Sequence, residues 1–290
     1  MADSKDKFRI GLVQMRTGKN VEDNFRQAEA FIRDAAARGA HYVQTPENTL
    51  IMEADAPRLL EKISPEDQTE GVPHFSHLAR ELRIWLHIGS LAVKAGKGRA
   101  ANRAFLFAPN GEAVCRYDKI HMFDVDLPSG ESYRESATFV PGKRAFVATL
   151  PWGGLGIATC YDIRFPEQYK ALARAGAKFL TAPSAFTKVT GEAHWHVLLR
   201  ARAIENGCFV FAAAQGGRHA NGRTTYGHSI AISPWGEILA EAGTEPGVTV
   251  ADIDAGEVDR VRTRIPALDH ARDFKVEVVL LPRYALEAAG

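Results

Sequence analysis

The feature that most limits how this chain can fold is a regular alternation of short apolar runs with amphipathic segments. Residues 9–15 (RIGLVQM) are almost continuously apolar, and residues 41–47 (HYVQTPE) form a second such run that Pro46 stops. Between the two runs, residues 21–39 carry apolar side chains at helical spacing and end at Gly39. Strands buried on both faces, with helices between them, predict a layered α/β fold.

The same alternation continues without an internal repeat or a low-complexity segment. It predicts strands at residues 84–93, 145–160 (two strands), 178–184, 208–215 and 247–254, helices at 75–82, 166–177 and 194–207, and hairpins at 102–119 and 227–243. We therefore expect a single domain over residues 1–266. Residues 267–290 are expected to form a C-terminal tail that packs on the domain or on a partner subunit.

Composition excludes several classes of protein. The formal net charge of +1 over 290 residues gives no reason to expect a nucleic-acid or anionic-membrane partner. No apolar run approaches the roughly 18 residues of a membrane span, and the polar N-terminus lacks the apolar core of a secretory signal. Three widely spaced cysteines favour a reducing compartment over a disulfide framework. We expect a cytoplasmic protein that needs no cofactor.

Cys160 is the first candidate for chemistry, because it stands where an apolar strand ends in the stretch IATCYDIRFPE (157–167). Pro166 is a favoured first residue of a helix, so the thiol is expected near a helix N-terminus, where the helix dipole favours a thiolate. Ligand crevices in α/β sheets lie at such strand ends. A buried core cysteine is the alternative interpretation, and it is the one assigned to Cys115 and Cys208.

Three charged residues have a similarly unusual placement. Glu47 ends a buried strand, Lys119 ends the second strand of a predicted hairpin, and Glu135 lies in a loop before the next strands. Each one alone is more typical of a solvated surface charge. Together with Cys160 they supply a carboxylate base, a cation for an oxyanion, a thiol nucleophile and a second carboxylate.

These residues and their surroundings resemble the carbon–nitrogen hydrolase (nitrilase) superfamily, which uses a Glu-Lys-Cys triad in this chain order. Glu47 in PENTL, Lys119 in YDKIHMFD and Cys160 in CYDIRFPE match the three triad motifs, and Glu135 in YRESATF matches a second glutamate. The likeness runs from the first strand to about Pro266. It implies a four-layer α-β-β-α sandwich, an amidase that works through a cysteine thioester, and assembly into homodimers or larger homo-oligomers.

Within that superfamily the downstream blocks are most similar to the Nit-type amidases, which include deaminated glutathione amidases and ω-amidases. The resemblance implies hydrolysis of a small acid amide such as α-ketoglutaramate. One departure is His196, where that branch usually has a glutamate. A nitrilase or an N-carbamoyl amino acid hydrolase would share the triad. A non-catalytic scaffold that retains the fold is a further alternative, against which the intact triad counts.

Five further residues are candidates for substrate binding. The backbone N–H of Tyr161 is expected to assist Lys119 at the oxyanion. Arg164 is expected to bind a substrate carboxylate, unless it forms a salt bridge with Asp162 or Glu167, and Thr190 is a hydroxyl donor beside it. Tyr226 and His228 are interpreted as pocket lining or as core. No metal site is expected, since two histidines two residues apart in HWH (194–196) point to different faces of a helix.

Overall fold

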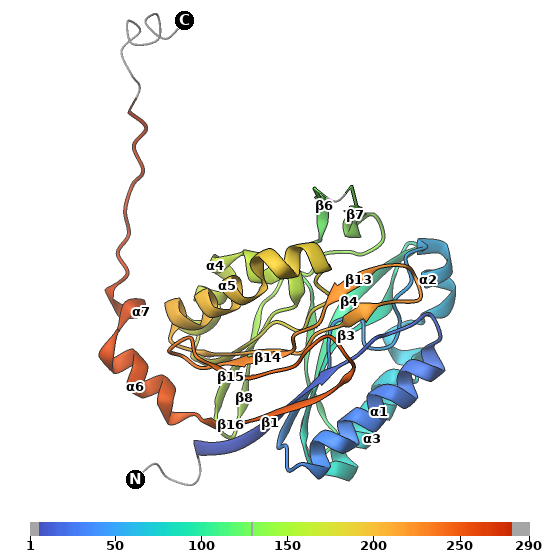
Figure 1. Cartoon of the computed structure of the whole chain (residues 1–290), viewed down its shortest axis with the longest axis horizontal. Coiled ribbons are helices and arrows are strands. Elements are labelled where there is room, and N and C mark those ends of the chain that lie inside the picture. Colours follow the sequence, from blue (N-terminus) through green and yellow to red (C-terminus); the bar gives the residue numbers. More distant parts are fainter. Residues whose placement is uncertain (1–5, 129, 280–290) are drawn as a thin grey trace, which may run out of the picture.

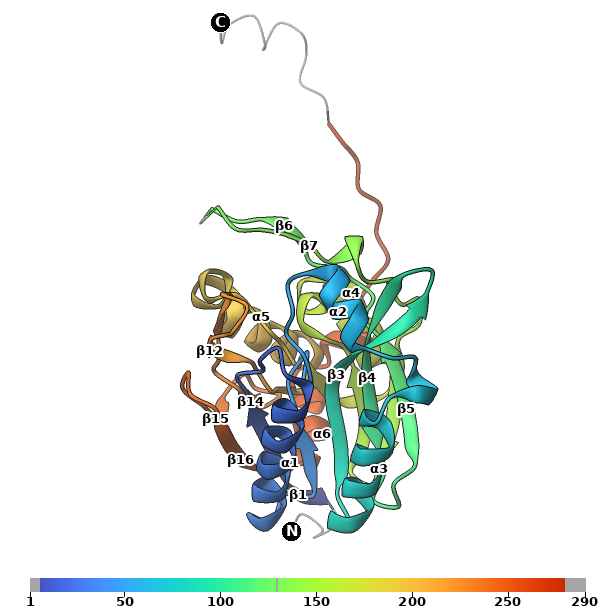
Figure 2. The same ribbon diagram turned by 90° about the vertical axis from the view of Figure 1, so that its right-hand side faces the viewer.

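The computed structural model describes residues 6–128 and 130–279, and it contains two stacked six-stranded sheets with helices outside (Figures 1 and 2). The first sheet has the order β16 (Gly247–Asp254), β1 (Lys7–Gln14), β2 (Tyr42–Gln44), β3 (Trp85–Gly96), β4 (Arg99–Phe107) and β5 (Ala113–Asp118). The second has the order β15 (Ile238–Glu241), β14 (Ile230–Ile232), β11 (Phe209–Ala212), β10 (Ala177–Thr181), β9 (Gly153–Ile157) and β8 (Phe146–Leu150).

The remaining elements are short strands and helices. Two small hairpins pair β6 (Asp124–Asp126) with β7 (Ser132–Arg134) and β12 (Gly216–Arg218) with β13 (Thr224–Tyr226). The α-helices are α1 (Val21–Ala37), α2 (Ala56–Lys62), α3 (Gly71–Leu82), α4 (Pro166–Arg174), α5 (Lys188–Asn206), α6 (Gly256–Arg264) and α7 (Ala267–His270). Single 3-10 turns form η2 (Glu66–Gln68), η3 (Glu135–Ala137) and η4 (Cys160–Arg164).

The sheets are buried on both faces, as the near-continuous apolar runs predict. In β11, Phe209 and Phe211 face the core between the two sheets, whereas Val210 and Ala212 face the layer of α4 and α5. This alternation follows from the two-residue period of a strand. On the other side, α1 and α3 cover the outer face of the first sheet. The structure thus confirms the predicted four-layer α-β-β-α sandwich.

Helix boundaries follow local capping signals, and two helices, α3 and α5, begin earlier than predicted. α3 begins at Gly71 instead of near Phe75. Asn20 caps α1 by accepting a hydrogen bond from the Asp23 N–H at 3.2 Å. α5 was expected to begin at His194, but it begins six residues earlier, at Lys188. Its N-cap is Thr187, whose side chain accepts a hydrogen bond from the Thr190 N–H. The pattern there contains polar and small residues, so apolar periodicity alone missed the first turns.

The C-terminal segment leaves the sandwich after α6, which packs Val258 and Val261 into the molecule. Beyond α7 the described part of the tail extends away from the body (Figure 1), and its apolar side chains are exposed, with Phe274 at 85%. Residues 280–290 of the predicted tail lie outside the described residues. Among the described residues, no helix combines the length and the apolar character needed to cross a lipid bilayer.

Candidate active site

All four predicted catalytic residues line one cavity of about 500 Å³. Glu47 lies just after β2 and Lys119 directly after β5, so both are delivered by the first sheet. Cys160 begins η4, which follows β9 of the second sheet, and Glu135 begins η3. The cluster is therefore assembled across the interface between the sheets, at strand ends where α/β folds form their crevices.

Lys119 is the centre of the charge arrangement. Its ammonium Nζ lies 2.8 Å from Glu47 Oε1 and 2.8 Å from Glu135 Oε2, and its side chain is only 2% exposed. The Asn102 amide donates to both carboxylates, at 2.9 Å to Glu47 and 3.1 Å to Glu135. Burial alone would lower the pKa of Lys119, but the negative charges of Glu135 and Glu47 outweigh it and hold the pKa well above its usual value. The Lys119 side chain is therefore positively charged at neutral pH.

The Glu47 carboxylate also contacts the nucleophile. Oε2 accepts a hydrogen bond from the Ala185 N–H at 3.0 Å, and the carboxylate also interacts with the Cys160 thiol. Burial would raise the pKa of Glu47, but Lys119 and this thiol contact hold the pKa below its usual value. The loop that carries Glu47 passes so close to Gly89 that a Cβ there would stand 2.2 Å from the Thr45 carbonyl oxygen. A larger residue at position 89 would press on the backbone of Thr45 and Pro46, directly before the base.

Cys160 is held in an uncommon backbone conformation. Its φ of 51° lies in the left-handed region, which is uncommon for non-glycine residues and is often retained at active sites. Its own N–H donates to the Pro183 carbonyl at 3.0 Å. Burial, and then the charge of Glu47, raise the pKa of the thiol above its usual range. Burial and the charge of Glu47 therefore oppose the thiolate that a helix dipole was expected to favour at Cys160.

Asp162 fixes the turn that carries the nucleophile. Its side chain has no exposed surface, and it accepts hydrogen bonds from the Thr159 N–H at 2.9 Å, the Tyr117 hydroxyl at 2.6 Å and the His121 N–H at 3.0 Å. Thr159 and Asp162 form a capping box around η4. The alternative in which Arg164 pairs with Asp162 is wrong, because Asp162 is already occupied by these donors.

Glu135 is partly exposed, with 13% of its side chain open to solvent, and it is held by Lys119 and by the backbone. Its Oε2 accepts from the Phe123 N–H at 2.7 Å as well as from Lys119. With Asn102 on its other oxygen, Glu135 is held by three different donors. A carboxylate in this position can keep Lys119 charged and aimed at the thiol.

Of the predicted substrate-binding residues, Tyr161 and Thr190 line the cavity. Arg164 lies one layer behind it, with its guanidinium carbon 5.7 Å from the centre of the Tyr161 ring and 5.5 Å from that of Phe186, which also lines the cavity. Its Nη2 is 3.3 Å from His194 Nδ1. No carboxylate partner for Arg164, Glu167 included, is seen within residues 6–128 and 130–279, so its contact with a substrate stays a prediction.

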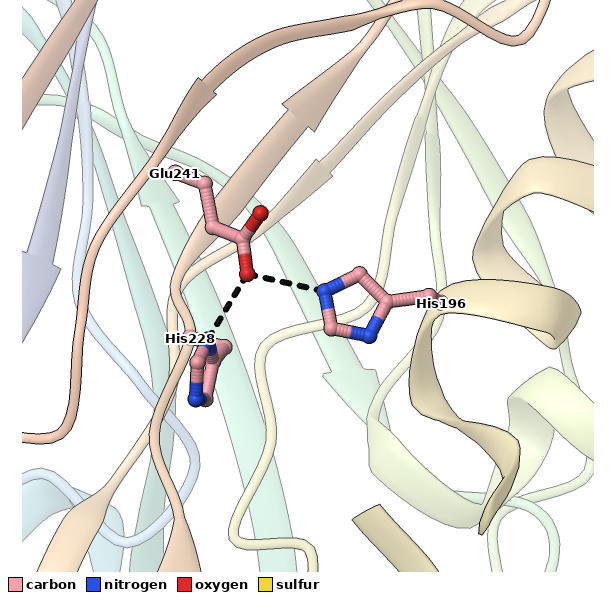
Figure 3. Close-up of side chains that lie close together, drawn as sticks. All are labelled: His196, His228 and Glu241. Carbon is pink, nitrogen blue, oxygen red and sulfur yellow. Dashed lines mark hydrogen bonds and ion pairs between the residues drawn. The ribbon is translucent and has the colours of Figure 1, made fainter. Parts of the chain in front are cut away.

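Tyr226 and His228 lie outside the lining of the cavity. Tyr226 reaches it only through its N–H, which donates to the Phe186 carbonyl at 3.0 Å. Both rings instead stand beside His196 and Glu241, where two imidazole nitrogens contact one carboxylate oxygen (Figure 3). As predicted, His194 and His196 point to different faces of α5. His196 nevertheless lies next to two other potential metal ligands, His228 and Glu241, from distant parts of the sequence.

Arg223 is a cavity residue that sequence reasoning missed. It lines the cavity beside Asn221, and its guanidinium carbon lies 4.9 Å from the centre of the Tyr133 ring. Its Nη2 donates to the Ala185 carbonyl, while its buried Nε has no hydrogen-bond partner among the described residues. The charge of Arg223 also helps to lower the pKa of Glu47. The only signal in the sequence was an arginine among small and polar residues, which is typical of any surface loop.

The arrangement contains the parts needed for nucleophilic acyl transfer. A thiol stands beside a carboxylate that can take its proton, and a permanently charged amine lies in the same cavity. The N–H of Tyr161 belongs to the first turn of η4, where backbone donors have no acceptor within the helix. Together with the ammonium, it can stabilise an oxyanion that forms on a carbonyl next to Cys160.

Comparison with known proteins gives matches over most of the chain. Residues 9–263 match the model of the carbon–nitrogen hydrolase family. A deaminated glutathione amidase from Synechocystis sp. (strain PCC 6803 / GT-S) is 40% identical over 262 residues, which are 89% of this chain and 96% of that protein. The human omega-amidase NIT2 is 36% identical over 267 residues, 91% of this chain and 95% of that protein.

Two solved structures are similar in fold. The NitFhit protein of C. elegans superimposes with a TM-score of 0.86 at 34% sequence identity, and the match covers 94% of this chain and 66% of that one. An amidase from Nesterenkonia sp. AN1, solved as a glutamate-to-glutamine mutant with acrylamide added to its active-site cysteine, has a TM-score of 0.74 at 28% identity. That match covers 89% of this chain and 98% of the amidase.

Proposed function

Since the chain belongs to the carbon–nitrogen hydrolase family, we propose that it hydrolyses the terminal amide of a small carboxylic acid through a thioester on Cys160. The observation that carries this proposal is the buried contact of Glu47, Lys119 and Cys160 in one cavity. Deaminated glutathione and other ω-amides such as α-ketoglutaramate are the substrate class, in line with the names of the two relatives.

In the acylation half of the reaction, Glu47 takes the thiol proton as the sulfur of Cys160 attacks the amide carbon. The carbonyl π electrons move to oxygen, and the resulting oxyanion is stabilised by the Lys119 ammonium and the Tyr161 N–H. Glu47 then returns the proton to the amide nitrogen. The C–N bond breaks, ammonia leaves (or an amine, when the substrate is deaminated glutathione), and the acyl group stays on sulfur as a thioester.

In the second half, water replaces ammonia. Glu47, ionised again, takes a proton from a water molecule as its oxygen attacks the thioester carbon. The tetrahedral intermediate is held by the same two donors, and its collapse breaks the C–S bond and returns the proton to sulfur. The raised pKa of Cys160 and the lowered pKa of Glu47 suit this cycle, because the resting pair is a thiol beside a carboxylate.

The cations near the cavity support an acidic substrate. Arg223 lines the cavity, and no salt bridge is seen for it within residues 6–128 and 130–279. Arg164 lies behind two lining rings and could reach the cavity by a rotation of its flexible side chain. An arginine fork binds a carboxylate through two parallel hydrogen bonds. Thr190 in the cavity lining offers a hydroxyl donor to the same substrate.

A substrate panel tests the proposal. The purified chain is incubated with an ω-amide of an α-keto acid, with a nitrile and with an N-carbamoyl amino acid, and the release of ammonia is followed. Fast turnover of the amide alone supports the proposal, and preference for either other compound assigns the triad to nitrile or carbamoyl hydrolysis. A non-catalytic scaffold would release ammonia from none of the three compounds.

We also propose that the chain works as a homodimer or a larger homo-oligomer in the cytoplasm. Support for assembly comes from the tail, where Phe274, Val276 and Val278 are each more than 80% exposed. The three free cysteines are compatible with a reducing compartment. Light scattering on a size-exclusion column tests assembly, and a stable monomer over the working concentration range would contradict it.

A further inference from the structure

Three side chains from separate elements converge outside the cavity (Figure 3). His196 lies in the middle of α5, His228 lies in the loop between β13 and β14, and Glu241 is the last residue of β15. Their potential ligand atoms all lie within 4.8 Å of one another. We propose that His196, His228 and Glu241 bind one divalent transition-metal ion of the Zn²⁺ class, which fastens α5 to the hairpin of β14 and β15.

The distances suit a first coordination shell. Glu241 Oε1 lies 2.8 Å from His196 Nε2 and 2.7 Å from His228 Nδ1. Zinc bonds of about 2.0–2.2 Å to nitrogen and oxygen place tetrahedral ligand atoms roughly 3.3–3.5 Å apart. The two carboxylate–imidazole pairs therefore need to open by less than about 1 Å to admit an ion, and the third pair of ligand atoms already lies within 4.8 Å. Their side-chain exposures of 26–31% leave room for water to complete the shell.

The backbone around the cluster is already fixed by other interactions. The Trp195 indole Nε1 donates to the His228 carbonyl at 2.9 Å, which joins α5 to the loop. Glu241 pairs with Ile230 in the β14–β15 ladder. The His228 N–H donates to the Gly243 carbonyl at 2.9 Å. Ligands held in this way lose little conformational entropy when an ion binds, and this preorganisation favours binding.

The donor set selects the kind of ion. Two imidazole nitrogens and one carboxylate suit Zn²⁺, Co²⁺, Ni²⁺ or Cu²⁺, whereas Mg²⁺ and Ca²⁺ prefer oxygen ligands only. Each imidazole must present a lone pair to the ion, so the proton on the nitrogen that faces Glu241 moves to the other ring nitrogen or to solvent. The negative charge of Glu241 offsets one of the two positive charges of the ion.

The site differs from the catalytic one, since none of its three residues lines the cavity. The two are nevertheless neighbours. The Tyr226 ring stacks on His228 with its centre 4.3 Å away, and it fills the space beside Gly191, where a Cβ would meet the ring at 2.2 Å. The Tyr226 N–H donates to Phe186 in the cavity wall. An ion at this position therefore stabilises the packing of α5 against that wall.

Metal binding by the full chain tests the proposal. Protein stripped with EDTA is titrated with Zn²⁺ in a calorimeter, and separately with Co²⁺ while its visible absorption is recorded. We expect one ion per chain, Co²⁺ bands typical of nitrogen and oxygen ligands, and a higher Tm with Zn²⁺. His196→Gln and His228→Asn should each weaken binding at least about tenfold. Asparagine is chosen at position 228 because it tolerates the φ of 58° found there.

The matched control is His77→Gln, because His77 also faces a carboxylate, Glu81, at 3.8 Å but has no third ligand within the described part of the chain. It should leave Zn²⁺ affinity unchanged. Unfolding of the metal-free variants shows whether each is folded, so that lost binding is not mistaken for lost structure. The proposal is overturned if wild type binds no Zn²⁺, or if binding is equal in the folded variants. It is also overturned if Co²⁺ shows a thiolate charge-transfer band that disappears after alkylation of Cys160.

Discussion

Replacing Lys119 with methionine should remove more activity than the loss of a single hydrogen-bond donor. Removing one oxyanion donor typically lowers kcat by about 10²–10³. Lys119 is also the counter-charge of two buried carboxylates at 2.8 Å, and unit charges even 4 Å apart interact by about 4 kcal/mol at an effective dielectric constant of 20. Without the ammonium, the pKa of Glu47 should rise and the base should be protonated at neutral pH. We expect kcat to fall by more than about 10³.

The pH dependence separates the two contributions. Lys119 lowers the pKa of Glu47, so wild type keeps its base ionised down to acidic pH, and the stability from this ion pair is lost only as pH falls through the lowered pKa. In Lys119→Met the acidic limb of the kcat profile should move to higher pH, and the residual activity should increase toward alkaline pH. Measurement of kcat with an ω-amide between pH 5 and 9 tests this expectation.

Stability provides a second readout for the same change. Breaking a buried ion pair by removing one partner costs about 3–5 kcal/mol, which corresponds to a decrease in Tm of roughly 5–15 °C. In the Lys119→Met variant, Glu47 and Glu135 have lost their counter-charge. Adding Glu135→Gln removes one of these two negative charges and should recover part of the lost Tm. Lys178→Met is the control, since its partner Asp259 is largely exposed. Turnover within tenfold of wild type with an unchanged pH profile would refute the reasoning.

Four further substitutions test the other parts of the site. Cys160→Ala should abolish ammonia release while Tm and circular dichroism stay close to wild type, and an active variant would exclude the thioester mechanism. Glu135→Gln should lower kcat at least about tenfold with little change in KM, because it holds Lys119; equal kinetics would reduce Glu135 to a structural loop residue. Arg164→Lys and Arg223→Gln should each raise KM for an ω-amide acid severalfold but scarcely affect propionamide, and equal effects on both substrates would indicate a structural role.

The layers of the fold were predictable because burial on both faces leaves near-continuous apolar runs. Glu47, Lys119 and Cys160 could be singled out for a related reason, since each follows a strand where a surface residue would not be expected. Asn102 was not found, although it bridges the two carboxylates. Asn102 lies within β4. Its contact with Glu135 forms only because η3 folds back next to β4, and local periodicity in the sequence does not predict such a tertiary contact.

The cluster of His196, His228 and Glu241 was missed for the same physical reason. The spacing of HWH correctly indicates that His194 and His196 point to different faces of one helix. It does not predict that residues 30 or more positions later in the sequence lie next to His196 in the fold. Arg223 and Asp162 show the same limit. Their partners are backbone groups or side chains on other elements, so their roles follow from the packing of the two sheets.

The order in which the strands are synthesised has a consequence for the newborn chain. Five strands of the first sheet, β1 to β5, are complete by residue 118, but the sixth, β16, ends at residue 254. Domains fold as units while the ribosome releases the chain from its N-terminus, so the first sheet waits for nearly the whole chain before its last strand can pair. Cys160 emerges in that interval, and its base belongs to the other sheet. A growing chain thus carries a thiol without a docked carboxylate, and its nucleophile becomes active only when translation is almost finished.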